Sequence, residues 1–127
     1  GEWQGLKEHH PDLFEKAKTH FDAKEYEAAI HGFTDYLKNP RAKSSEAAIF
    51  FRAESYFAIK DYKNAIIDYS KFPEKFTKSK RMPAALLKIG QSFEGLGMKN
   101  DAKPFYQELT EKFPKSPEAK KAKAKHK

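Results

Sequence analysis

Histidines have the clearest potential for chemistry in this sequence, because an imidazole can bind a metal ion or transfer a proton near neutral pH. His9 and His10 are adjacent, whereas His20, His31 and His126 are widely separated along the chain. No pair therefore has the spacing that places two ligands on one face of a helix. From this pattern we expect no metal site.

Other signatures of catalysis do not occur in the sequence. It has no glycine-rich phosphate-binding loop, no nucleophile elbow and no paired carboxylates on a defined cleft, and Gly95-Leu96-Gly97 is typical of a turn. Cysteine is absent, which excludes disulfides and thiolate ligands and leaves the redox compartment open. We predict that the protein is not an enzyme and uses no cofactor.

Length and composition indicate one helical domain with a large surface. The 127 residues are 39% hydrophobic and 34% charged, a balance that fits a thin helical protein better than a compact enzyme. No apolar run approaches the roughly 20 residues of a membrane helix, and residues 1–10 lack the apolar region of a signal peptide. We expect no membrane insertion and interpret residues 1–10 as a linker or lead-in.

The net charge of +7 is concentrated near the C-terminus. From Phe113 onward, six lysines stand against a single acidic residue, Glu118. Such a tail could attach the protein to nucleic acid or anionic lipid, but lysines also suit the last turns of a helix, where they meet the negative end of its dipole. We favour the second interpretation and expect no nucleic-acid partner.

Hydrophobic periodicity predicts helices along most of the chain. In residues 47–69 apolar side chains recur every three or four residues on both sides of a turn at Lys60-Asp61, which predicts a helical hairpin. The stretches 13–37 and 86–109 repeat this layout. We therefore predict one domain over 11–127, with hairpins at about 12–40, 45–77 and 82–114 and a lysine-rich capping helix at 116–125.

Residues that start or stop helices set the predicted boundaries. Ser44 or Ser45 is expected to cap the first helix of the second hairpin, and Gly97 to supply a left-handed helix stop. Pro73 should end its helix one residue earlier, because a proline in a helix interior costs about 3 kcal/mol. Pro104 is expected near the first turn of its helix, where backbone amides have no partner to lose.

Equivalent residues recur at intervals of 36 and 37 residues. The small residues of the first helices are Ala17, Ala53 and Gly90. The second helices carry small residues and then aromatic ones four positions later, at Ala29, Ala65 and Ala102 and at Phe33, Tyr69 and Tyr106. The interval is close to the roughly 34 residues of tetratricopeptide repeats, which this pattern resembles. Small residues at helix crossings let the axes approach to about 8 to 10 Å.

Large residues come three positions after the small ones of the first helices, at His20, Tyr56 and Phe93. On this pattern we expect His20 at a buried, aromatic-like position. A buried imidazole would favour its neutral form and could make the packing sensitive to acid.

The resemblance extends to one family. ESYFAIKDYKNAI, MPAALLKIGQSFEGLG and DAKPFYQELTEKFPKSPEAKKAK are similar to the C-terminal domain of Tol-Pal-associated periplasmic proteins, the YbgF or cell division coordinator family, over about residues 12–125. Lys16 and Arg52 depart from it, since they stand where the repeat usually has leucine. The resemblance implies an all-α fold, a right-handed superhelix of three tetratricopeptide hairpins plus a C-terminal capping helix.

What the resemblance implies about function is a periplasmic module of Gram-negative bacteria. It would bind a TolA-type protein and help couple outer-membrane constriction to the peptidoglycan synthase machinery during cell division. A monomeric fragment is implied as well, because trimerisation in that family comes from an N-terminal coiled coil that this sequence lacks. The nearest rival is a structural subunit of an outer-membrane complex of the assembly-lipoprotein type.

In a stack of such hairpins the first helices line the concave face, where we predict a partner site. Ten residues form this prediction: Phe14, Lys18, Phe21, Phe50, Phe51, Glu54, Phe57, Leu87, Gln91 and Glu94. Five of them are phenylalanines, which favours an apolar trough for an extended or helical peptide over a solvated wall. The alternative is that several of these rings are buried between repeats. The three charged residues would set the register of the peptide or be ordinary solvated charges.

One known binding mode can be tested on the sequence. Repeat proteins that grip the C-terminal carboxylate of heat-shock chaperones resemble each other in presenting asparagine and lysine or arginine from their first helices. Here Asn39, Asn64 and Asn100 fall at turns or on second helices. We therefore expect no carboxylate clamp.

Overall fold

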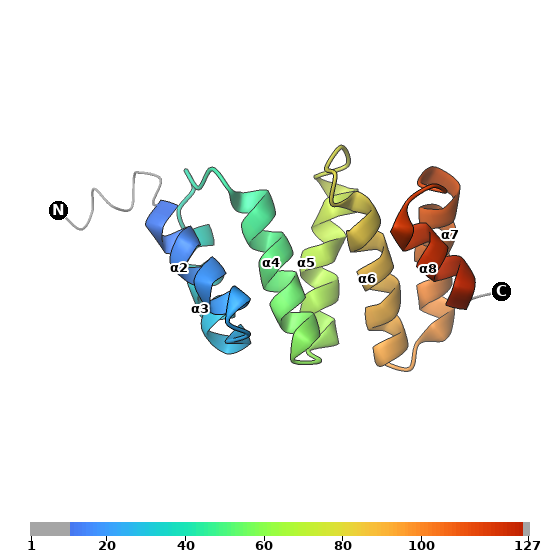
Figure 1. Ribbon diagram of the computed structural model, residues 1–127, viewed down its shortest axis with the longest axis horizontal. Helices are drawn as coiled ribbons and strands as arrows, with labels where there is room; N and C mark the ends of the chain where they lie inside the picture. Colours follow the sequence, from blue (N-terminus) through green and yellow to red (C-terminus); the bar gives the residue numbers. More distant parts are fainter. Residues whose placement is uncertain (1–10, 126–127) are drawn as a thin grey trace. The chain divides into compact units, whose positions relative to one another are not determined.

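The computed structural model describes residues 11–125, and all regular structure in this range is helical. Figure 1 shows its seven helices: α2 (Pro11–Asp22), α3 (Tyr26–Leu37), α4 (Ser45–Ala58), α5 (Tyr62–Glu74), α6 (Met82–Gly95), α7 (Lys99–Lys112) and α8 (Pro117–Lys125). This confirms the predicted all-helical class. Among the described helices none has the length and apolarity to span a bilayer. The predicted lead-in at 1–10, with His9 and His10, and also His126 lie outside the described residues.

Two compact units make up the chain. Unit 1 contains α2, α3 and α4, and unit 2 contains α5, α6, α7 and α8. The first and third predicted hairpins, α2–α3 and α6–α7, each lie within one unit, whereas the second, α4–α5, falls across the boundary. A single domain over 11–127 stays a prediction.

Unit 1 is built around α3, which packs against both α2 and α4. Its buried core includes a cluster formed by Ala17, Ala29, Phe33, Tyr36 and Ala48. Helices α2 and α3 approach closely at Gly32, where an added Cβ would lie 2.7 Å from the Cβ of Ala17. Ala17 is therefore a close-contact position as predicted, and the residue opposite it is a glycine that the repeat pattern did not single out.

Unit 2 is built around α6, which packs against α5 and α7 and also meets α8. This position explains why α6 has more buried hydrophobic side chains than any other described helix. They are Met82, Ala85, Leu86, Leu87 and Ile89. Ala119 and Ala122 of α8 are also buried. The prediction of a capping helix that covers the last hairpin with small side chains is confirmed.

Left-handed backbone follows the first helix of each hairpin. The φ angle is +62° at Lys24, +65° at Lys60 and +76° at Gly97. Beyond Lys24 the N–H of Glu25 donates to the carbonyl of His20 at 2.8 Å, and the equivalent bond follows α6. The prediction for Gly97 is confirmed, and two lysines adopt the same conformation despite the steric cost of their Cβ atoms.

The end of α5 differs from the prediction. The helix runs through Pro73 and ends at Glu74, two residues beyond the predicted stop near Phe72. Pro73 lies in the last turn, and beyond it the N–H of Lys75 still donates to the carbonyl of Lys71 at 2.7 Å. The helix end is therefore stabilised around the proline, which interrupts little of the hydrogen-bond ladder there.

Pro104 also lies deeper in its helix than predicted. Because α7 begins at Lys99, Pro104 is in its second turn rather than its first. Its missing N–H is one that would otherwise donate to the carbonyl of Asn100, so the predicted reason for its tolerance is wrong. The helix nevertheless continues to Lys112.

His20 lies at the surface, which corrects its predicted buried position. Its side chain is 47% exposed, and its Nδ1 is 2.9 Å from Oε1 of Glu25. The reason is the phase of α2: Phe21, one residue and about 100° further round the helix, is the side chain that packs inward. The suggested acid-sensitive packing therefore has no buried imidazole to act through.

Ser44 precedes α4, but its hydroxyl makes no capping hydrogen bond. Instead its backbone N–H donates to Oη of buried Tyr36 at 2.9 Å. Ser44 is therefore the N-cap residue as predicted, but it does not cap the helix through its side chain. The loop before α4 is held through the tyrosine of α3.

Candidate functional site

The ten predicted partner-binding residues lie on the first helix of each hairpin. Phe14, Lys18 and Phe21 are on α2, and Phe50, Phe51, Glu54 and Phe57 are on α4, so these seven belong to unit 1. Leu87, Gln91 and Glu94 are on α6 in unit 2. Nine of the ten are partly exposed, and Leu87 is buried.

Within unit 1, α2 and α4 touch and bring aromatic rings together. The rings of Phe21 and Phe51 have centroids 5.2 Å apart, and Phe51 also stacks on buried Phe33 at 6.2 Å. Phe14 packs edge-on against Phe33 at 5.6 Å. The rings of Phe14, Phe21 and Phe51 pack against the core on one side and are partly exposed to solvent on the other. The same side chains therefore contribute to the core and present part of their surface to a possible partner.

Phe50 extends this cluster along α4. Its ring lies edge-on to that of Phe51, with centroids 5.7 Å apart. Phe50 and Phe57 are both partly exposed, so neither is sealed from solvent. We use the name aromatic face for the surface formed by Phe14, Phe21, Phe50, Phe51 and Phe57.

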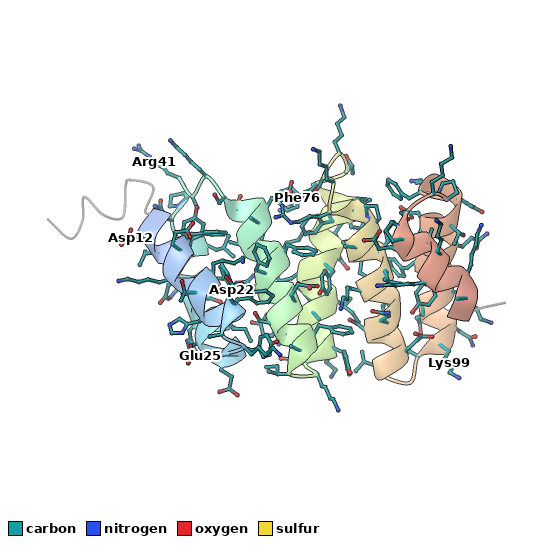
Figure 2. The ribbon with its side chains drawn as sticks, in the orientation of Figure 1. Asp12, Asp22, Glu25, Arg41, Phe76 and Lys99 are labelled. Atoms are coloured by element: carbon teal, nitrogen blue, oxygen red, sulfur yellow. The ribbon has the colours of Figure 1, made fainter. Side chains whose placement is uncertain are left out.

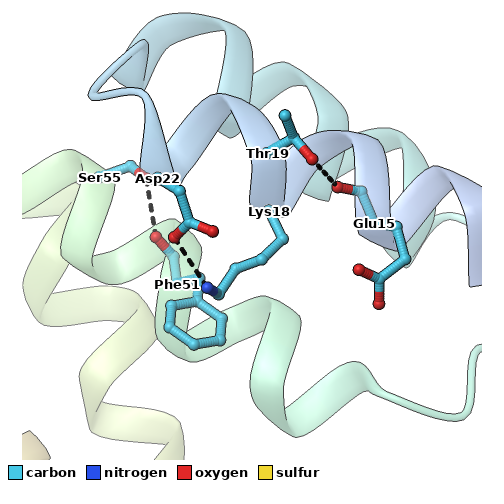
Figure 3. A network of polar contacts seen from close by, with 6 residues as sticks. All are labelled: Glu15, Lys18, Thr19, Asp22, Phe51 and Ser55. Atoms are coloured by element: carbon cyan, nitrogen blue, oxygen red, sulfur yellow. Dashed lines mark hydrogen bonds and ion pairs between the residues drawn. The ribbon is translucent and has the colours of Figure 1, made fainter.

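Lys18 lies over the aromatic face. Its Nζ is 4.8 Å from the ring centroid of Phe51 and 5.8 Å from that of Phe21, which are cation–π distances. Figure 3 shows the same ammonium group bonded to Oδ1 of Asp22, at 2.8 Å. The lysine side chain is 29% exposed. A charged group is thus held in one place beside the rings.

Asp22 was not among the predicted residues, although its spacing of four from Lys18 could have indicated the pair. Glu54, a predicted site residue on α4, is partly buried. In Figure 3 the hydroxyl of Ser55 donates to the carbonyl of Phe51 at 2.8 Å, one of the bonds that fix this part of α4.

On α6 the candidate residues have different surroundings. Leu87 is 6% exposed and belongs to the interior around α6. Glu94 accepts a hydrogen bond from the hydroxyl of Tyr106 on α7, at 2.6 Å. Burial, and then the bond to Glu94 and its negative charge, raise the pKa of Tyr106 well above its usual range. Nothing in the local sequence indicated this pair, since it joins two helices of a hairpin.

Metal or acid–base chemistry has few candidates in the described chain. Residues 11–125 contain no group of three His, Cys, Asp or Glu side chains placed to hold a metal ion. A shallow hollow lies elsewhere on α2, lined by Asp12, Glu15, Lys16, Thr19 and His20. On unit 1 the described surface offers a contact area rich in aromatic side chains.

Comparison with known proteins agrees with this architecture. A tetratricopeptide-repeat family model matches residues 84–116, which include most of α6 and all of α7. The solved tetratricopeptide domain of OM64 from Arabidopsis superimposes with a TM-score of 0.73, 19% identity and 91% coverage of both chains. The fold is that of a tetratricopeptide-repeat domain.

A second tetratricopeptide structure supports the same conclusion. The first such domain of Spaghetti (RPAP3), solved with the HSP90 peptide SRMEEVD, has a TM-score of 0.70 and 23% identity, with coverage of 89% of this chain and 86% of that one. No curated protein sequence matches significantly. The tetratricopeptide fold predicted from the repeat interval is thereby confirmed.

Proposed function

We propose that this tetratricopeptide-repeat domain is a non-catalytic interaction module that binds a segment of a partner protein on the aromatic face. The observation that carries the proposal is the group of half-buried rings on α2 and α4, with the ammonium group of Lys18 held between Phe51 and Phe21. Partly exposed aromatic side chains next to a fixed charge are the features from which binding hot spots are built.

The structural relatives support a polypeptide as the ligand. The RPAP3 domain, of similar size and fold, was solved with a heptapeptide bound. A chaperone-type carboxylate clamp is a poor model for this chain, because asparagine is absent from α2, α4 and α6. We propose that the partner is recognised through apolar anchors, with Lys18 and Glu54 setting its register.

For the identity of the partner we propose a TolA-type component of the Tol-Pal system. Its support is the likeness of the repeat phrases and the lysine-rich last helix to the cell division coordinator family. The domain would then act in the periplasm, where it would help to coordinate envelope constriction with peptidoglycan synthesis.

The proposal is tested by capture of purified TolA on the immobilised domain. Phe50→Ala combined with Phe57→Ala should abolish capture while circular dichroism shows unchanged helicity. The matched control is Leu13→Ala combined with Ile67→Ala, which also removes two large apolar side chains from exposed positions, 39% and 58% exposed, on α2 and α5. This control should bind like the wild type.

Two results would contradict the proposal. Equal loss in both double variants would mean that binding does not depend on the aromatic face. Unchanged capture by the phenylalanine variant would favour a structural subunit of an outer-membrane assembly, which packs through other surfaces.

A further inference from the structure

The two units differ strongly in charge. Residues 60–127 contain seventeen lysines and arginines and eight aspartates and glutamates, a formal charge of +9, whereas residues 1–59 carry −2. The excess is not confined to the C-terminal tail. Four of the cations, Lys75, Lys78, Lys80 and Arg81, lie in the seven residues that connect α5 to α6, where no acid occurs. We call residues 75–81 the basic loop.

The basic loop is internally bonded. The N–H of Ser79 donates to the carbonyl of Phe76 at 2.9 Å, and the N–H of Arg81 donates to the hydroxyl of Ser79 at 3.0 Å. The ring of Phe76 packs edge-on against buried Phe72 of α5 at 5.2 Å. Figure 2 shows Phe76 at the helical base of the loop. The loop therefore needs little further ordering on binding.

Its lysines point to solvent. Lys75, Lys78 and Lys80 are exposed, and none of them forms an ion pair with a residue in the range 11–125. The antiparallel α6–α7 hairpin brings the end of α7 to the same end of unit 2, and Lys115 is exposed just beyond it. In Figure 1 the basic loop and the α7–α8 connection lie at the same end of unit 2.

We infer that the basic loop binds an acidic segment of a polypeptide. This is a second site, independent of the aromatic face. Carboxylates complement exposed ammonium groups, and a cluster of like charges attracts such a segment more strongly than any single lysine.

Two other polyanions fit the loop less well. Single-stranded nucleic acid is held by aromatic rings on which its bases stack, but the ring of Phe76 is already packed against Phe72. Stable attachment to anionic lipid usually needs an apolar anchor besides the charges. The exposed large apolar residues described in unit 2 are elsewhere, Ile67 on α5 and Leu96 and Met98 at the opposite, α6–α7 turn.

The test is binding of fluorescently labelled decaglutamate, followed by anisotropy at low ionic strength. The variant Lys75→Gln/Lys78→Gln/Lys80→Gln should bind roughly tenfold more weakly than wild type, since three exposed ion pairs are lost. Lys63→Gln/Lys99→Gln/Lys103→Gln is the matched control. It removes the same charge from exposed positions at the other end of unit 2 and should change the dissociation constant less than about twofold.

Three outcomes would overturn the inference. They are absence of decaglutamate binding by the wild type, equal weakening by both triple variants, and tighter binding of oligodeoxythymidine or phosphatidylserine vesicles than of decaglutamate. The Phe50→Ala/Phe57→Ala variant should bind decaglutamate normally, so this inference and the proposed function can fail separately.

Discussion

The hydroxyl of Tyr106 on α7 donates a 2.6 Å hydrogen bond to the carboxylate of Glu94 on α6. Two repeat intervals earlier, the equivalent positions are held by Phe33 and Phe21, and both of those rings contact Phe51. These two repeat positions are thus joined by a hydrogen bond in unit 2, whereas in unit 1 they hold two rings that both pack against Phe51. Because the bond in unit 2 depends on one hydroxyl group, a single substitution can remove it.

Tyr106→Phe removes this hydrogen bond while keeping the ring. Because the acceptor is a carboxylate, we expect the free energy of unfolding to fall by about 1 to 2 kcal/mol in urea titrations at neutral pH. Tyr26→Phe is the control, since Tyr26 is half-buried and its hydroxyl has no hydrogen-bond partner among the described residues. Equal stability of the two variants would contradict the assigned role of the bond.

The same variant should also change the response to alkali. The pKa of Tyr106 is raised in the folded protein, whereas an unfolded tyrosine ionises near pH 10. Its contribution is therefore complete below about pH 9 and is lost as the pH rises above about 10, where the unfolded chain releases the proton first. The stability difference between wild type and Tyr106→Phe should be constant from about pH 7 to 9 and shrink by about pH 11. A difference that grows with pH would be the opposite of this expectation.

Ser92 should be replaceable with a gain in stability. It is fully buried on α6, and its Oγ finds no hydrogen-bond partner in the described chain. Ser92→Ala should therefore raise the free energy of unfolding by about 1 kcal/mol. The equivalent Ser55 donates to the carbonyl of Phe51, so Ser55→Ala should lower it instead. Urea unfolding of both variants gives the comparison, and a loss at Ser92 would show that its hydroxyl is satisfied in solution.

The lysines with left-handed backbone give a fourth prediction. Glycine adopts φ values near +60° without the strain of a Cβ, so Lys24→Gly should stabilise the protein by about 0.5 to 1 kcal/mol. Conversely, Gly97→Ala should destabilise it by about 1 kcal/mol. Lys38→Gly, at a helix end with φ −69°, is the control and should bring no gain. Equal melting temperatures of Lys24→Gly and Lys38→Gly would contradict the strain argument.

Two glycines on α6 lie against tyrosine rings that we expect to differ in their freedom to move. A Cβ at Gly90 would meet the ring of buried Tyr106 at 2.5 Å, and one at Gly95 would meet the ring of half-buried Tyr62 at the same distance. Gly90→Ala should cost about 1 to 3 kcal/mol, because the Tyr106 ring is enclosed and bonded. Gly95→Ala should cost much less, since the Tyr62 ring can turn toward solvent. Equal losses in chemical denaturation would show that neither ring can move.

Much of this fold follows from short-range pattern. The alternation of small and large residues located Ala17, Ala29 and Gly90 correctly, because helices that cross closely tolerate only small side chains. Helix starts after the turns were also accurate, as at Tyr26. Contacts between helices were less predictable. Gly32 faces Ala17 through the rotation of α3, which repeat counting does not fix.

The partner surface was less predictable than the fold. The repeat pattern assigned His20 to the interior, because this position holds a large buried residue in a typical repeat. In α2 the neighbouring Phe21 packs inward instead, and His20 is exposed. Whether a phenylalanine such as Phe51 serves the core or a ligand depends on how much of its ring neighbouring helices cover, and sequence spacing is the same in both cases. Partner identity depends on exposed side chains that the fold does not constrain.

The C-terminal helix has a consequence for engineering. Among the described side chains of α8, the fully buried ones are the small Ala119 and Ala122. The start of the helix is fixed locally, because the N–H of Ala119 donates to the hydroxyl of Ser116 at 3.0 Å. Residues 116–125 thus form a small lid on α6 and α7. Exchanging that lid for a complete hairpin that begins with the same Ser-Pro start would lengthen the array by one module while leaving the interior of the existing hairpin untouched.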